Sequence, residues 1–112
     1  MFKHFDKITD PLIVGLNDKL LSMLDNARTV AEVPFVLTSG LRTEEYNRKI
    51  GGVEDSAHLY GLAVDIQCTD SINRFNIIYG LMVAGFRRIG VSQTHIHADI
   101  DESKPKYCLF LE

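Results

Sequence analysis

Two short stretches decide how this chain is organised: Ser56-Ala57-His58-Leu59-Tyr60-Gly61-Leu62-Ala63-Val64-Asp65, and, about thirty residues further on, His95-Ile96-His97-Ala98-Asp99. The apolar content of residues 62–68 and 95–100 is typical of short strands. Because residues two apart on a strand face the same side, His95, His97 and Asp99 share one face of the second strand. Three polar side chains on one face are costly in a core unless they have partners. The sequence therefore predicts a sheet with one polar face.

Apolar spacing predicts the elements around these strands. Leucines at helical spacing indicate a helix over residues 11–29, with Asp10 as its N-cap and Pro11 at its first position. The other predicted elements are a strand at 34–39, a short helix at 43–49, a loop from Gly51-Gly52 to Ser56, a helix at 71–84, a strand at 86–91 and an edge strand at 106–111. Since the late strands follow each other through short connections, we expect an α+β fold with a small antiparallel sheet and flanking helices.

The helix over residues 71–84 should bury one apolar face. We expect this face to hold Ile72, Phe75, Ile78 and Leu81 or Met82. Gly85 is expected just beyond the C-terminal end of the helix, where a left-handed residue commonly stops it.

Length and composition define the broad class. A chain of 112 residues with 46% hydrophobic content suits a single domain over residues 1–112. The net charge of -3 disfavours nucleic-acid partners, and no apolar run is long enough for membrane insertion. No secretion signal is seen at the N-terminus, so we expect the chain to be cytoplasmic as synthesised. We also expect it to be a monomer. Cys68 and Cys108 lack CxxC spacing and are expected to be reduced.

His58, Asp65 and His97 are candidate metal ligands. Imidazole nitrogen and carboxylate oxygen both bind zinc, and three protein ligands leave a fourth position open, as in catalytic sites. Gly61 would let the chain turn back between His58 and the strand of Asp65. The alternative is that these are ordinary hydrogen-bonded side chains, and the residues alone leave both interpretations open.

Longer motifs carry a family resemblance. They are Thr38-Ser39-Gly40-Leu41-Arg42-Thr43 followed by Tyr46-Asn47, then Gly51-Gly52, the pattern SxHxxGxAxD from Ser56 to Asp65, and His95-x-His97. Together they resemble the zinc D-alanyl-D-alanine carboxypeptidases and L-alanyl-D-glutamate endopeptidases, over about residues 36–99. That family cuts the peptide stems of bacterial cell walls, includes many bacteriophage endolysins and shares its fold with the hedgehog signalling domain.

The resemblance implies roles for five residues. It implies that His58, Asp65 and His97 hold one zinc ion. Arg42 would point into the cleft, bind a carbonyl or carboxylate of a peptidoglycan stem peptide and steady the oxyanion, whereas Ser56 would help to hold the substrate. The alternatives are a surface ion pair for Arg42 with a neighbouring glutamate, and a loop or capping hydroxyl for Ser56.

One departure from the family pattern concerns the general base. Many relatives carry a glutamate or aspartate three residues before the last histidine ligand, where this chain has Thr94. We predict His95 as the base, since histidine titrates near neutral pH. Asp99 is either a second catalytic candidate or a residue that orients a ligand histidine. The missing acid leaves an alternative to the zinc peptidase: a hedgehog-like metal-binding domain that acts as a protein-binding or virion structural module.

Overall fold

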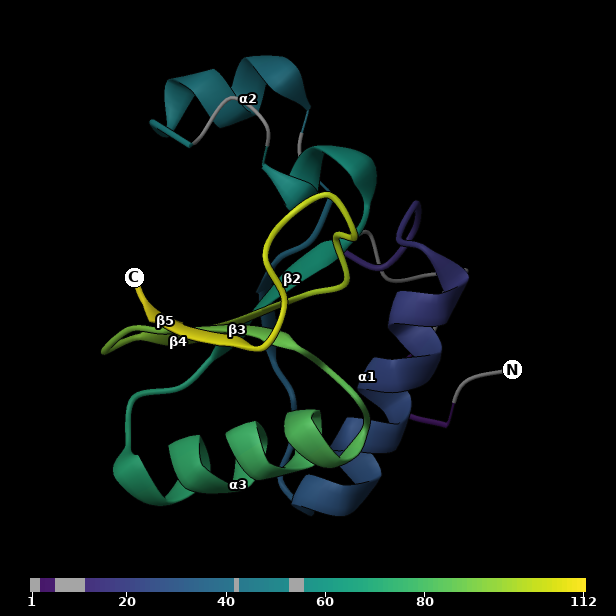
Figure 1. Cartoon of the computed structure of the whole chain (residues 1–112), viewed down its shortest axis with the longest axis vertical. Coiled ribbons are helices and arrows are strands. Elements are labelled where there is room, and N and C mark those ends of the chain that lie inside the picture. The colour runs from purple at the N-terminus through teal and green to yellow at the C-terminus, as the bar shows by residue number, and fades with distance from the viewer. Residues whose placement is uncertain (1–2, 6–11, 42, 53–55) are drawn as a thin grey trace.

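A five-stranded sheet forms the centre of the computed structural model, which describes residues 3–5, 12–41, 43–52 and 56–112 (Figure 1). The strands are β1 (Leu37–Ser39), β2 (Ala63–Gln67), β3 (Arg88–Val91), β4 (His95–Asp99) and β5 (Cys108–Leu111), in the order β1-β2-β4-β3-β5. All pairs are antiparallel except β3 with β5, which is parallel. The predicted α+β class with a small sheet is confirmed, and the parallel edge strand is its one departure from an antiparallel sheet.

The two longer helices, α1 (Asp18–Ala31) and α3 (Ser71–Val83), lie together on one side of the sheet (Figure 1). The core between these helices and the sheet contains Val64 and Ile66 from β2 and Ile96 and Ala98 from β4, each with no exposed surface. Because side chains alternate along a strand, the residues between these four point to the opposite face. That second face carries the polar residues of β2 and β4. The short helix α2 (Glu44–Lys49) and the 3-10 helix η1 (Ala57–Tyr60) complete the fold.

The first helix begins later than predicted. Its N-cap is Asn17, whose side chain accepts hydrogen bonds from the backbone N–H groups of Lys19 and Leu20. Gly15 has a φ of 88°, a left-handed conformation that a helix does not contain, so residues 12–16 form turns instead. The predicted cap at Asp10-Pro11 lies outside the described residues.

The third helix buries a different face from the predicted one. Ile78 and Leu81 pack in the core as expected, together with Ile77. Ile72 and Phe75 were predicted to be buried but are exposed, by 76% and 71%; of the two alternatives Leu81 and Met82, Leu81 is the buried one. The reason is that α3 approaches α1 through Gly80, where a Cβ atom would lie only 2.5 Å from the Ala27 carbonyl oxygen. This close approach fixes which side of α3 faces inward.

The remaining boundaries follow the predictions closely, with two exceptions. Strand β1 is shorter than the predicted strand at 34–39, and η1 lies between the predicted loop and β2, where no helix was predicted. Thr43 and Asp70 cap α2 and α3, and Gly85 follows α3 with a φ of 101°. Cys68 and Cys108 are free thiols. Among the described residues, no helix has both the length and the apolar character needed to cross a membrane.

Candidate metal centre

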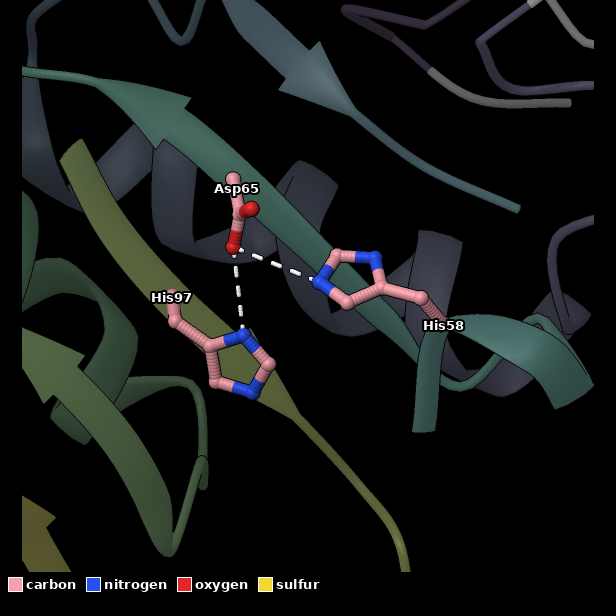
Figure 2. A group of neighbouring side chains, drawn as sticks. All are labelled: His58, Asp65 and His97. Atoms are coloured by element: carbon pink, nitrogen blue, oxygen red, sulfur yellow. Dashed lines mark hydrogen bonds and ion pairs between the residues drawn. The ribbon is translucent and has the colours of Figure 1, made fainter. Parts of the chain in front are cut away.

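The two central strands and η1 bring together the three predicted metal ligands, His58, Asp65 and His97, here called the ligand triad (Figure 2). Asp65 on β2 is directly paired with His97 on β4, so their side chains lie side by side on the polar face of the sheet. His58 comes from η1, which ends at Gly61 with a φ of 69° before the chain enters β2. That left-handed turn, expected from the sequence, aims His58 back at the strand.

The triad is compact and buried. The Oδ1 atom of Asp65 lies 3.4 Å from His58 Nε2 and 3.1 Å from His97 Nδ1. One ligand atom from each of the three residues lies within 4.8 Å of the other two, and all three side chains are buried. A carboxylate between two imidazoles in this way is a donor set that suits zinc.

The hydrogen bonding of His58 supports a metal ion in this position. Its Nδ1 donates to the Gly40 carbonyl oxygen at 2.8 Å, because a carbonyl can only accept. In the neutral ring, Nε2 then carries a lone pair, and this buried atom has no hydrogen-bond partner among the described residues. A lone pair that faces the Asp65 carboxylate is repelled unless a cation lies between them. The residues present therefore fit a bound metal ion.

His97 is held from both sides. Its Nδ1 faces Asp65, and its Nε2 donates to Asp99 Oδ2 at 2.7 Å. Burial alone would lower the pKa of His97, but the hydrogen bonds and negative charges of Asp65 and Asp99 outweigh burial and raise the pKa of His97 to about 9 in the metal-free chain. Burial alone would raise the pKa of Asp65, but the hydrogen bond with His97 and the nearby imidazole of His58 hold this pKa well below its usual range. In the metal-free chain, the triad thus holds a proton at a site for which a metal ion would compete.

Asp99 has little freedom to act on a substrate. Its side chain is 1% exposed, and besides His97 it accepts hydrogen bonds from Arg88 Nε at 2.9 Å and from the Asp101 backbone N–H at 3.1 Å. Burial alone would raise the pKa of Asp99, but these donors and the charge of Arg88 keep it lowered. Of the two roles left open by the sequence, this geometry favours the orienting one.

A cleft of about 490 Å³ opens over the triad. It is lined by Ile50, Gly51, Gly52, Ser56, Ala57, His58, Asp65, Arg88, His95, His97, Asp99, Lys104, Phe110 and Glu112. His95 and Ser56, both predicted from the sequence, therefore border the same space as the triad. The Ser56 hydroxyl caps η1 by accepting from the His58 backbone N–H at 3.2 Å. Arg42 lies outside the described residues, and its predicted role stays a prediction.

Three parts of the site were not foreseen from the sequence. The Gly40 carbonyl, which holds His58, is a backbone group and leaves no trace in the residue types. Arg88 and Glu112 reach the site from β3 and from the end of β5, and their side chains line the cleft. The signal for Glu112 is its alternation with Phe110, which places both on one face, but only once the partner of β5 is known.

The fold and the site together define an α+β domain with a buried His–Asp–His group, able to hold a metal ion, beneath an open cleft. The comparison with protein families agrees with this class. The chain matches the family model described as Peptidase M15 over residues 4–101, and it therefore belongs to that family. No curated protein and no solved structure matched the chain.

Proposed function

We propose that this chain is a zinc-dependent peptidase that hydrolyses an amide bond in the stem peptides of bacterial peptidoglycan. Membership of the Peptidase M15 family supports peptidase activity. The single observation that carries the metal requirement is the buried Nε2 atom of His58, which faces Asp65 and has no hydrogen-bond partner in the described part of the chain. The chain would act on the wall as a carboxypeptidase or an endopeptidase, and release from a phage-infected cell as an endolysin is one setting for it.

In this proposal the triad holds one zinc ion through His58 Nε2, Asp65 and His97 Nδ1. Zinc in such a site supplies Lewis acidity, which polarises a carbonyl group and makes water a nucleophile at neutral pH. The residues around the triad fix the ligands in place. Gly40 holds the tautomer of His58, and Asp99 holds that of His97 by accepting from its Nε2.

The cleft supplies the substrate-binding surface. Its volume of about 490 Å³ suits a short peptide segment rather than a folded protein. Lys104 and Arg88 are both in the lining, where Lys104 pairs with Asp101 and Arg88 pairs with Asp99. By resemblance, Arg42 would add a contact to a substrate carbonyl and Ser56 would help to hold the peptide.

The direct test is digestion of purified peptidoglycan sacculi by the zinc-loaded chain, read by mass spectrometry of the released peptides. We expect cleavage at one type of amide bond, its loss on addition of a chelator and its return with zinc. The mass of the products identifies the bond and separates carboxypeptidase from endopeptidase activity.

The matched variant is His97→Ala, which should lose zinc and activity while keeping the fold, because His97 lies on a strand whose core side is unchanged. His4, a partly exposed histidine far from the cleft in sequence, provides the control substitution His4→Ala. Full zinc content and full activity in His97→Ala would contradict the ligand assignment. A zinc-loaded wild type that cleaves no wall preparation would instead favour the metal-binding domain without catalysis.

A further inference from the structure

A second polar group lies beside the ligand triad, at the point where β4 begins and β3 and β5 end. His95 Nε2 is 2.7 Å from Glu112 Oε1, and both side chains are about one third exposed, at 28% and 33%. One ligand-type atom from each of Asp65, His95 and Glu112 lies within 4.8 Å of the other two. Both residues of this His95–Glu112 pair therefore border the cleft next to the triad.

The hydrogen bonds of Ser92 determine which nitrogen of His95 carries its proton. Ser92 Oγ accepts from the backbone N–H groups of Thr94 at 3.2 Å and His95 at 3.0 Å, which uses both of its lone pairs. Its own hydrogen is then left for the nearest of three acceptors, which is His95 Nδ1 at 2.9 Å; the His95 carbonyl oxygen lies at 3.2 Å and the Thr94 hydroxyl at 3.5 Å. The Thr94 hydroxyl also lies 3.3 Å from Nδ1. Because Nδ1 accepts, the neutral ring carries its hydrogen on Nε2 and donates it to Glu112.

Among the described residues, Glu112 is the carboxylate of the cleft that is left for chemistry. Three carboxylates line the cleft within the described part of the chain. Asp65 belongs to the triad, and Asp99 is committed to His97, Arg88 and the backbone of Asp101. Glu112 receives one hydrogen bond through Oε1, and its Oε2 makes none with the described residues. Its backbone N–H is anchored to the Val91 carbonyl at 2.9 Å, which fixes where the side chain starts.

Gly90 leaves the space that lets Glu112 reach the cleft. Gly90 lies in β3 between His97 of β4 and Phe110 of β5. A Cβ atom at this position would lie 2.5 Å from Phe110 Cε2 and 3.1 Å from Glu112 Cδ. The missing side chain lets the side chains of β5 lean across β3 toward the triad.

We infer that Glu112 is the proton acceptor of the hydrolytic reaction, and that His95 is a positioning residue that orients it; this inference rests on the proposed function. In the reaction, the oxygen of water bonds to the carbonyl carbon and one water proton passes to the Glu112 carboxylate. As the C–N bond breaks, Glu112 returns this proton to the leaving nitrogen, so the products are a carboxylic acid and an amine. This reverses the role that the sequence favoured for His95.

The test compares zinc-loaded variants of the full chain on a soluble stem-peptide fragment that the wild type cleaves. We expect Glu112→Gln to lower kcat by about 100-fold or more with little change in KM, since general-base catalysis contributes about 10²–10⁴-fold. Glu112→Asp should retain part of the rate. His95→Gln, which keeps an N–H donor, should lose less than His95→Leu, and neither should lose as much as Glu112→Gln. Glu102→Gln, on an exposed residue paired with Lys106, is the control.

Three readouts do not depend on activity. Each variant and the wild type should contain one zinc ion per chain and melt at similar temperatures. Long-range ¹H–¹⁵N correlation spectra of the wild type should show the His95 ring protonated at Nε2 and unprotonated at Nδ1, with the Nε2–H signal shifted in Glu112→Gln.

Four results would overturn the inference. They are a Glu112→Gln rate within twofold of the wild type, a larger loss in His95→Gln than in Glu112→Gln, a His95 ring protonated only at Nδ1, and a second zinc ion in the wild type that Glu112→Gln removes. The last result would make the pair a metal site. A zinc-loaded wild type that cleaves no substrate refutes the proposed function and this inference together, whereas an active wild type with an active Glu112→Gln variant refutes this inference alone.

Discussion

Asp99 has a buried side chain that acts by orienting the neighbouring His97 ring. By accepting from His97 Nε2 it leaves Nδ1 as the atom that faces Asp65 and the space of the proposed metal ion. In Asp99→Asn the amide is a weaker acceptor, and the tautomer of His97 is less firmly held. We expect the zinc affinity to fall by about 10–100-fold while the fold is kept. Competition with a coloured zinc chelator measures this, with Asp25→Asn as a control far from the site. Equal affinities in Asp99→Asn and the wild type would rule out the orienting role.

At the scale of residues, the sequence predicts the triad because the residue types that bind metals, histidine and aspartate, can be identified directly in it. The chain has only four histidines, so few combinations of histidine and aspartate could form a metal site. The alternation of side chains along a strand places His97 on one face with His95 and Asp99. The supporting groups follow a different rule. A backbone carbonyl such as that of Gly40 is present at every residue, so its selection by His58 depends on the folded path of the chain. The roles of Arg88 and Glu112 likewise depend on which strand lies beside which.

Gly90 is an element-scale feature, because its missing side chain sets how β5 lies against β3. In Gly90→Ala the new methyl group would overlap Phe110, whose ring is the end of a flexible side chain and can swing away. We expect a stable fold, with the ring of Phe110 moved from its present 5.7 Å separation from the His97 ring and with a reduced rate of hydrolysis. Aromatic chemical shifts and kcat measure the two effects. Leu109→Ala, on the exposed side of β5, is the control. Unchanged Phe110 shifts would show that β5 does not need this space.

Replacing Gly80 in helix α3 should destabilise the fold, unlike the replacement of Gly90. A methyl group there would meet the Ala27 carbonyl at 2.5 Å, and a backbone atom of a packed helix cannot move aside as a side chain does. Overpacking costs about 1–3 kcal/mol, whereas replacing glycine by alanine in a helix gains about 1 kcal/mol. We therefore expect Gly80→Ala to lower the free energy of unfolding in urea, and Ile72→Ala on the exposed face to change it by less than about 0.5 kcal/mol. A more stable Gly80→Ala variant would mean that α1 and α3 are not in this close contact.

The same two helices explain where element prediction succeeded and failed. Apolar spacing finds α3, but this helix carries apolar residues around most of its surface, so spacing alone cannot choose the buried side. The buried side of α3 is determined by contacts between small residues, Gly80 with Ala27 and Ala31. Small residues contribute little to a hydrophobic pattern, so the pattern does not reveal this contact. The start of α1 was misplaced for a related reason, because Gly15 and the Asn17 cap are local signals that were outweighed by the leucine pattern. Strands β2 and β4 were placed well since alternation and ligand positions agree there.

For the whole molecule, the triad links stability to pH and to metal. The folded pKa of His97, about 9, lies above the ordinary histidine value of 6.5. The stabilisation gained from protonated His97 is therefore fully present below about pH 6.5 and is lost as the pH rises toward 9. The shift corresponds to at most about 3 kcal/mol. Asp65, with a lowered pKa, contributes stability above about pH 4 that is lost in acid. We expect the metal-free chain to be most stable between about pH 4 and 6.5 from these two groups.

Zinc should reverse the alkaline half of that profile, because the metal ion and the proton compete for His97 Nδ1. As the pH rises from about 6.5 to 9 the proton leaves more easily, so zinc affinity and the rise in melting temperature on adding zinc should both increase. Melting curves with chelator and with excess zinc, recorded across this range, measure both trends. In His97→Gln the metal-free chain should lose its decline above pH 6.5, and zinc should give little stabilisation at any pH. If the zinc-induced shift of the wild type were constant from pH 6.5 to 9, His97 would not be the group at which proton and metal compete.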